Sequence, residues 1–201
     1  MRHDEPLAID EIDRERVYEG FRSVDVIRYR EAGRGPERVV RREIMAARDA
    51  VAVIAWDPGL ERLVLVHQFR IAAHDATGRG MEVEVVAGLI EPDERGEPDE
   101  EATVRAELRE EAGVEAGRCV RLCETLSSPG MSDERVVYWF AEVDASSMAE
   151  RAGLDEETEE TFPFLASLPD ALAAIDAGRI ANAIAILAIL VFARRFAELT
   201  R

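Results

Sequence analysis

The sequence predicts an α/β layered fold on a mixed sheet, with a small N-terminal antiparallel β subdomain. The first third of the chain holds strand-like stretches in which apolar and polar residues alternate. Helix-like and strand-like stretches then follow one another without regular βαβ alternation, which favours a mixed sheet over a parallel one. A length of 201 residues with 47% apolar content suits one globular unit and a small appended one.

The N-terminal elements are two strand pairs. Residues 16–45 alternate on either side of "EAGRGPE", a segment full of turn-forming residues, which predicts strand, turn and strand. Residues 49–72 repeat this pattern around the turn "DPG" at 57–59. We therefore expect an N-terminal β subdomain over 1–48 and the main domain over 49–201.

The remaining elements follow in order. Pro98 suits the first turn of a helix and Gly113 its C-terminal cap, which predicts a helix over 98–112. Strands are expected near 118–126 and 135–143, an acidic loop at 153–161, and helices at 167–178 and 182–199. The apolar run at 180–193 is too short to span a bilayer, so it predicts a buried C-terminal helix.

Charge and cysteine content limit the possible partners. The net charge of −17 disfavours nucleic acid and anionic membranes, and an anionic substrate would need positive charge supplied locally. No N-terminal stretch has the pattern of a secretory signal. We expect Cys119 and Cys123 to be reduced packing residues in a cytoplasmic protein.

The acidic helix is the candidate chemical site. At about 100° per residue its apolar stripe consists of Val104, Leu108 and Ala112. Glu111 lies about 20° from Val104 in this projection, so its carboxylate is directed toward the buried side. Together with Glu107 and Glu110 it forms a group of hard oxygen ligands that suits magnesium or manganese, which also bind phosphate oxygens. An ordinary solvated acidic helix is the alternative interpretation.

A wider pattern resembles a known family. Gly88 is followed by Glu107, Leu108, Glu110, Glu111, Gly113 and Val114, which resembles the box of the Nudix hydrolases. The segments "EGFRSVDVIRYR", "VVRREI", "EVVAGLIE", "SSPGMSDER" and "LDEETEET", in this order, resemble the bacterial ADP-ribose pyrophosphatases of that family over nearly the whole chain. The resemblance implies a Nudix-type α/β/α sandwich.

The chain departs from the family's pattern at two places. Ala106 stands where the family usually has an arginine that orients the glutamates, and Arg105 is rotated about 100° away. Either Arg105 or another arginine compensates, or metal affinity is lower. The box is also about four residues longer than usual, with "DERG" the inserted segment. Glu94 and Glu97 therefore both stand as candidates for the loop glutamate of the box.

The resemblance implies a metal-dependent mechanism with Mg²⁺, or alternatively Mn²⁺. Its metal ligands would be the backbone carbonyl of Ala87 and the carboxylates of Glu107, Glu111 and Glu159. Glu110 would assist catalysis, and Glu157 in the late acidic loop would act as the base. The choice among Glu156, Glu157, Glu159 and Glu160 stays open, and a solvated surface turn is the other interpretation of this loop.

The resemblance also implies the substrate contacts. They would be made by Phe21, Arg42, Glu43, Arg70, Leu89, Ser128 and Glu134. Phe21 would stack on adenine, and Arg42 and Arg70 would bind the diphosphate, a task that suits the planar guanidinium. Arg41 and Arg135 would add positive charge. Arg22 and Ala47 differ from what close relatives usually carry, so base recognition is expected to be looser or altered.

The expected function is hydrolysis of ADP-ribose to AMP and ribose 5-phosphate. The alternatives are a pyrophosphatase for GDP-mannose or another nucleoside diphosphate sugar, and a non-catalytic Nudix-fold nucleotide sensor. The resemblance further implies a homodimer with shared sites, in which Phe21 and Arg42 of one subunit act with Glu107 and Glu111 of the partner subunit. Neither nucleic acid nor a membrane is expected as a partner.

Overall fold

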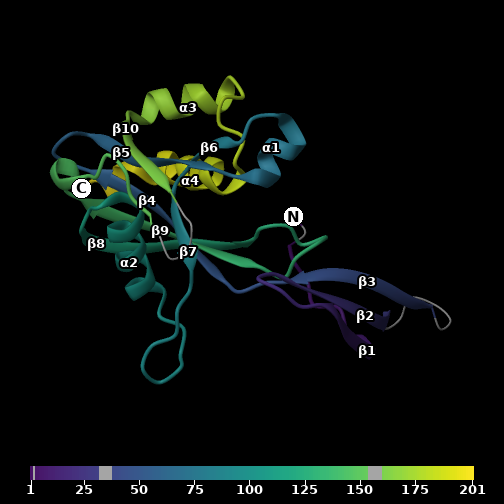
Figure 1. Cartoon of the computed structure of the whole chain (residues 1–201). Coiled ribbons are helices and arrows are strands. Elements are labelled where there is room, and N and C mark those ends of the chain that lie inside the picture. The colour runs from purple at the N-terminus through teal and green to yellow at the C-terminus, as the bar shows by residue number, and fades with distance from the viewer. Residues whose placement is uncertain (2, 32–37, 154–159) are drawn as a thin grey trace. The chain divides into compact units, whose positions relative to one another are not determined.

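The chain forms two compact units. The computed structural model describes residues 1, 3–31, 38–153 and 160–201 (Figure 1). The first unit consists of Met1–Arg48 and Leu126–Arg135, and the second of Asp49–Thr125 and Val136–Arg201. The loop 126–135 thus joins the N-terminal unit although it lies far along the chain.

The first unit contains a three-stranded antiparallel sheet. Its strands are β1 (Ile9–Tyr18), β2 (Ser23–Glu31) and β3 (Val39–Ala46), in the order β1-β2-β3. The strands expected within 16–45 are present as β2 and β3. The sequence analysis missed most of β1, because all ten of its residues are exposed and it lacks a buried apolar face.

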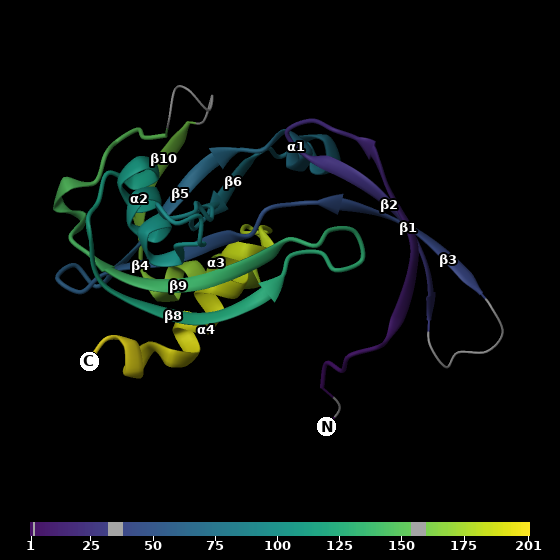
Figure 2. The ribbon, with the colours of Figure 1, turned by 90° about the horizontal axis from the view of Figure 1, so that it is seen from below.

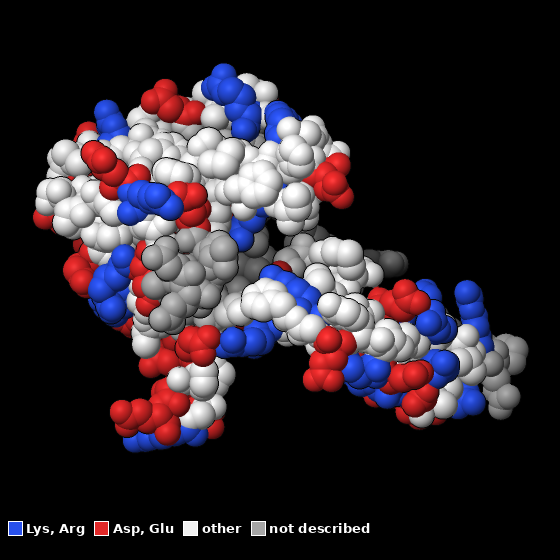
Figure 3. Space-filling model, viewed as in Figure 1, with Lys and Arg blue, Asp and Glu red and all other residues white. Residues whose placement is uncertain are grey.

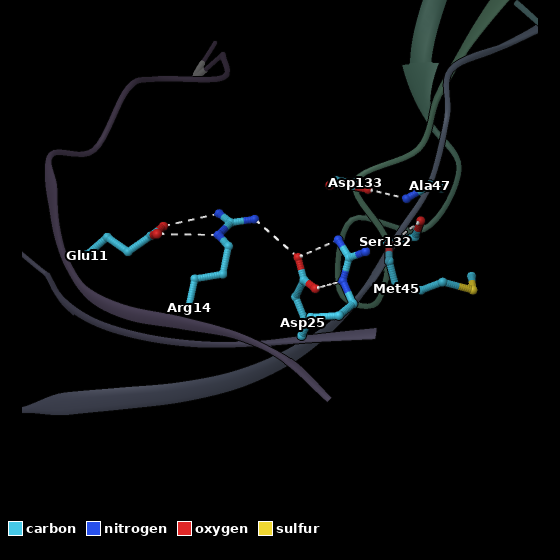
Figure 4. Close-up of polar contacts among 8 residues, drawn as sticks. Glu11, Arg14, Asp25, Met45, Ala47, Ser132 and Asp133 are labelled. Atoms are coloured by element: carbon cyan, nitrogen blue, oxygen red, sulfur yellow. Dashed lines mark hydrogen bonds and ion pairs between the residues drawn. The ribbon is translucent and has the colours of Figure 1, made fainter. Parts of the chain in front are cut away.

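Ion pairs across the sheet accompany the pairing of β1 with β2. Aspartates and arginines on the two strands are joined in the pairs Asp10–Arg30, Asp13–Arg28 and Arg16–Asp25. Asp25 is buried and also lies 3.6 Å from Arg14, which in turn bonds Glu11 (Figure 4). Charges of both signs are accordingly interspersed over this sheet in the space-filling view (Figure 3).

The loop 126–135 is fastened to the end of β3. The Met45 amide donates to the Met131 carbonyl at 2.8 Å, and the Ser132 hydroxyl donates to the Met45 carbonyl at 3.2 Å. The Ala47 amide donates to the Asp133 carboxylate at 2.9 Å (Figure 4). These contacts fix the "SSPGMSDER" segment beside the strand that carries Arg42 and Glu43.

The second unit is built on a seven-stranded mixed sheet. Its strands are β4 (Ala50–Asp57), β5 (Arg62–Phe69), β6 (Met81–Glu84), β7 (Val86–Leu89), β8 (Ala116–Leu126), β9 (Arg135–Val143) and β10 (Thr161–Ala166). The order is β10-β5-β4-β9-β8, with β6 paired to β5 and β7 paired to β4. Strand β4 runs parallel to β9 and antiparallel to β5, so the sheet is mixed as expected.

Helices cover both faces of this sheet (Figures 1 and 2). They are α1 (Ile71–Thr77), α2 (Glu100–Ala112), α3 (Leu168–Asp176) and α4 (Ala183–Leu199). Alternate residues of β4 and β5 face two separate cores. Val51, Val53 and Val66 pack with α2, whereas Ile54, Leu65 and Phe140 pack with α3 and α4. The α/β/α sandwich is therefore confirmed.

Several boundaries differ from the prediction. The strand expected to reach residue 72 ends at Phe69, and α1 begins at Ile71. The N-cap of α2 is Asp99, so Pro98 precedes the helix instead of starting it. The expected strands near 118–126 and 135–143 and both C-terminal helices are confirmed. In the described part of the chain, no helix is long and apolar enough to span a membrane.

Candidate metal and substrate site

Helix α2 carries the predicted metal ligands and is held at both ends. The Asp99 carboxylate accepts a hydrogen bond from the Ala102 amide at 2.9 Å, which caps the N-terminus. Gly113 adopts the left-handed conformation, with a φ of 68°, and its amide bonds the Arg109 carbonyl. The predicted stripe of Val104, Leu108 and Ala112 is fully buried, so the helical phase of the prediction is confirmed.

Glu111 is buried beneath this helix, as its position near Val104 predicted. The residue is only 4% exposed. The backbone amide of Ala87 on β7 donates to its carboxylate Oε2 at 3.1 Å. A carboxylate in this setting needs hydrogen bonds or a cation to stay charged. The helix thereby brings Glu111 to the strand that the resemblance implicates in metal binding.

Glu107 lies over the next residue of the same strand. A Cβ atom built on Gly88 would lie only 1.7 Å from Glu107 Oε1 and 2.0 Å from its Cδ. No residue with a side chain fits at position 88 while Glu107 occupies this place. The glycine that opens the box is therefore required for space. Its φ is not positive, so conformational freedom is not the reason.

The donor set fits a hard divalent cation. Glu107 and Glu111 are one helical turn apart and meet Gly88 and Ala87, and carboxylate and carbonyl oxygens are the ligands that Mg²⁺ and Mn²⁺ prefer. The structure does not gather Glu110 with them into one group. Across residues 1, 3–31, 38–153 and 160–201, no three His, Cys, Asp or Glu side chains are placed to hold a metal ion.

The acidic loop begins and ends at the last turn of α2. The Gly153 amide donates to the Glu110 carbonyl at 2.9 Å, and the Thr161 hydroxyl donates to the Glu111 carbonyl at 2.8 Å. Ala152 and Thr161 also bond each other in both directions, at 3.0 and 2.9 Å. Gly153 and Thr161 therefore both lie beside the turn of α2 that carries Glu110 and Glu111.

The predicted base and the fourth predicted ligand belong to the acidic loop. Glu157 and Glu159, like Glu156, lie outside the described residues. Glu160 is described, and its carboxylate lies 2.5 Å from the guanidinium of Arg151. Of the four candidates in this loop, Glu160 is thus the one whose contacts the structure describes.

Arg105 does not replace the arginine missing at Ala106. Its guanidinium bonds the Glu101 carboxylate at 2.7 and 3.1 Å. It also donates to the carbonyls of Ala116 and Gly117, at 2.6 and 3.1 Å. Arg105 therefore ties α2 to the start of β8, and the hypothesis that it orients the box glutamates is not supported.

The insertion in the box forms a closed loop, residues 92–98. The Asp93 carboxylate accepts hydrogen bonds from the amides of Arg95 and Glu97, at 2.8 and 2.9 Å. Pro92 and Pro98 pair at its neck, and Gly96 turns the chain with a φ of 83°. Glu94 and Glu97 are both exposed, and neither side chain has a partner among the described residues. The choice between them stays open.

Two of the predicted substrate residues belong to the second unit. Arg70 precedes α1, and its guanidinium bonds both carboxylate oxygens of Glu84 on β6, at 3.0 and 2.8 Å. Leu89 ends β7 opposite Ala50. The sequence analysis missed Glu84, although an acidic residue within the apolar run of β6 and β7 is a usable signal of a buried polar contact.

The other substrate candidates belong to the first unit. Phe21 is 92% exposed, and the Arg22 guanidinium lies 5.8 Å from its ring centroid. Arg22 also lies 3.4 Å from the Glu134 carboxylate, so the residue that departs from the family links two predicted substrate residues. The remaining candidates are Arg42 and Glu43, exposed on β3, and Ser128, whose carbonyl accepts bonds from Met131 and Ser132.

The comparisons with known proteins agree with this geometry. A model of the NUDIX domain matches residues 46–183. The ADP-ribose pyrophosphatase of Escherichia coli strain K12 is 34% identical over 183 residues, which cover 90% of this chain and 86% of that protein. The corresponding protein of Haemophilus influenzae is 31% identical over 205 residues, covering 99% and 92%.

Two further likenesses extend the comparison. A GDP-mannose pyrophosphatase of Klebsiella pneumoniae is 35% identical over 136 residues, which cover 64% of each chain. The crystal structure of an ADP compounds hydrolase superposes with a TM-score of 0.75 over 97% of both chains at 18% identity, a likeness of fold. The glutamates of α2 that lie beside β7 are consistent with the NUDIX domain match and with these relatives. The domain match and the two ADP-ribose pyrophosphatases show that the chain belongs to the Nudix hydrolase family.

Proposed function

We propose that this protein is a divalent-metal-dependent pyrophosphatase that hydrolyses ADP-ribose to AMP and ribose 5-phosphate. The observation that carries the proposal is that Glu111 accepts a hydrogen bond from the Ala87 amide and that the Glu107 carboxylate lies over Gly88. The names of the two ADP-ribose pyrophosphatases that this chain resembles over most of its length support the choice of substrate.

Glu107, Glu111 and the carbonyl of Ala87 would hold the ion, with Glu159 as a further ligand. Such an ion, Mg²⁺ or Mn²⁺, neutralises charge on the phosphates and lowers the pKa of a bound water. Glu157 would accept the proton of the attacking water, and Glu110 would assist from the same helix. The hydrogen bonds at Gly153 and Thr161 support this assignment, because they tie both ends of the acidic loop to α2.

The proposed substrate contacts are those that the resemblance implies. Arg70 would hold the diphosphate together with Arg42, and Phe21 would stack on the base. Leu89, Glu43, Ser128 and Glu134 would complete the ribose and phosphate contacts. Arginine is suited to this task because it binds two phosphate oxygens at once.

We further propose a cytoplasmic homodimer whose sites are shared between subunits. Strand β1 has no buried residue and exposes Ile9, Ile12 and Val17, a surface that a second copy of the chain would cover. Cys119 and Cys123 are both free thiols, which accords with a reducing compartment.

A pyrophosphatase for GDP-mannose is the second candidate. It is favoured by the likeness to the Klebsiella pneumoniae protein and by Arg22, whose guanidinium beside Phe21 can donate hydrogen bonds to a guanine edge. A non-catalytic nucleotide sensor is the third, although retention of the box glutamates favours turnover.

A substrate panel tests these proposals. ADP-ribose, GDP-mannose, UDP-glucose and diadenosine polyphosphates are each incubated with the protein and Mg²⁺, and a phosphatase then releases phosphate from the monoester products. We expect ADP-ribose to have the highest kcat/KM, with AMP and ribose 5-phosphate as products. A tenfold preference for GDP-mannose would establish the second candidate, and binding without turnover of any substrate would establish the sensor.

A further inference from the structure

Two side chains from distant parts of the second unit meet around one buried carboxylate. Glu84 on β6 has a side chain that is 8% exposed, and it accepts hydrogen bonds from Arg70 and from Asn182. Arg70 precedes α1, and Asn182 is the N-cap of α4. Both helices contact β6, so the network joins three elements at one end of the sheet.

Glu84 fixes the direction of the Arg70 side chain. Its two oxygens accept bonds from Arg70 Nε at 3.0 Å and Nη2 at 2.8 Å, the geometry in which a guanidinium has least freedom to rotate. These bonds use two of the five N–H donors of the guanidinium. The Arg70 side chain is 41% exposed, so the guanidinium held by Glu84 still reaches solvent.

Asn182 in turn fixes Glu84 and caps α4 with the same amide. Its Nδ2 donates to Glu84 Oε1 at 3.2 Å, and its Oδ1 accepts from the Ala185 amide at 3.0 Å. The opposite amide orientation would place an oxygen against the carboxylate and an NH₂ group against an N–H, so only one orientation satisfies both neighbours. The start of α4 and the Arg70 side chain are therefore coupled through Glu84.

The position of Glu84 relates this network to the metal helix. Glu84 precedes Ala87 by three residues, a separation of at most about 10 Å along an extended strand. Strand β7, which follows, is the strand that meets Glu107 and Glu111. An arginine anchored at Glu84 is thus held at a set distance from the glutamates, so that one diphosphate could contact both the arginine and a metal held by the glutamates.

We propose that Glu84 and Asn182 are positioning residues that hold the Arg70 guanidinium in place to bind the substrate's diphosphate. The inference rests on the proposed pyrophosphatase function, because Arg70 is the group that touches the substrate. Neither Glu84 nor Asn182 contacts it. Loss of either residue removes this restraint on the Arg70 side chain, which weakens diphosphate binding before and during the reaction and therefore raises KM more than it lowers kcat.

The experiment separates positioning from helix capping. Asn182→Ser keeps a capping oxygen but removes the Nδ2 donor, whereas Asn182→Ala removes both. Ser167→Ala is the matched control, because Ser167 caps α3 through the Asp170 amide and has no contact with Glu84. Denaturant unfolding, kcat and KM for ADP-ribose, and the Kd for ADP-ribose in chelator are measured for each variant.

We expect Asn182→Ser to unfold at the wild-type midpoint while its KM and Kd rise at least fivefold and kcat stays within about twofold. Ser167→Ala should unfold earlier with an unchanged KM. A wild-type KM and Kd in Asn182→Ser, or an equal rise in Ser167→Ala, overturns the proposal.

Glu84→Gln provides a second and independent test through a double-mutant cycle. It should raise KM and Kd at least tenfold in the wild-type background but add no further change when Arg70 is already alanine. Full additivity would mean that Glu84 acts by another route, which refutes the proposal. If the wild-type protein neither binds nor hydrolyses any nucleotide sugar, the proposed function and this inference both fail. If it does so and the variants behave like wild type, only the inference fails.

Discussion

Replacing Gly88 by alanine should displace Glu107 and leave the fold intact. The added Cβ would lie 1.7 Å from Glu107 Oε1, whereas Cβ atoms essentially never approach another atom closer than 3.0 Å. The carboxylate must therefore move by about 1.3 Å or more. The clashing atoms are the far end of a flexible side chain, so the backbone can stay in place. A misplacement of about 1 Å in a catalytic site can lower the rate about 10²-fold, which is the loss of kcat we expect.

The assay is phosphate release from ADP-ribose at saturating Mg²⁺, combined with circular dichroism and with calorimetric titration of Mn²⁺. Gly117→Ala is the matched control in the same unit, because its new Cβ would meet its nearest neighbour, the Glu142 carbonyl, at an ordinary 3.4 Å. We expect the control to keep wild-type kcat and metal affinity. Gly88→Ala with a native spectrum and undiminished kcat would refute the role given to Glu107.

Four further predictions concern the metal, the helix, the first unit and the assembly. Dialysis against chelator should abolish turnover and added Mg²⁺ or Mn²⁺ should restore it, and full activity without metal would contradict the mechanism. Glu111→Gln should lose at least ~10²-fold in kcat and Glu110→Gln less, since Glu111 is the more buried carboxylate; equal small losses would count against the site. A hydrogen bond from Arg16 lowers the pKa of Asp25 in the folded state. The ion pair between them therefore contributes its full stabilisation above the unfolded-state pKa, which is near 4. This contribution is lost as the pH falls through the lowered folded-state pKa. The unfolding midpoints of wild type and Asp25→Asn should therefore converge at acid pH, and a constant difference would exclude the pair as the cause. Mixed dimers of Arg42→Ala and Glu111→Gln should regain one working site in two, whereas exchange-competent mixtures that stay inactive would exclude shared sites.

The sequence predicted the metal helix well because its signals are local. The burial of Val104, Leu108 and Glu111 follows from helical periodicity within eight residues, and Gly113 marks the end by its own backbone conformation. Strands β4 and β5 could be predicted equally well, because an alternation of apolar and polar residues with a period of two indicates a strand directly.

The elements that the sequence did not reveal depend on distant partners. Strand β1 pairs by charge, and Asp10 meets Arg30 twenty positions away, so no apolar alternation marks it. The contact between Asn182 and Glu84 joins residues separated by 98 positions. In the sequence Asn182 merely interrupts an apolar run, and its hydrogen bond to Glu84 cannot be inferred without the arrangement of α4 against β6.

The closed loop at residues 92–98 makes this part of the chain tolerant of length changes. Its neck is joined by the hydrogen bond from the Asp93 amide to the Glu97 carbonyl, at 2.7 Å, and below it the Asp99 amide bonds the Glu91 carbonyl at 3.1 Å. Because the ends are tied to each other, residues added at the tip leave the spacing between β7 and α2 unchanged. Doubling the length of a flexible loop adds only about 0.6 kcal/mol of closure entropy. A small reporter domain inserted between Glu94 and Arg95 would therefore leave Gly88 and Glu107 in place, although it separates the Arg95 and Glu97 amides from the Asp93 carboxylate.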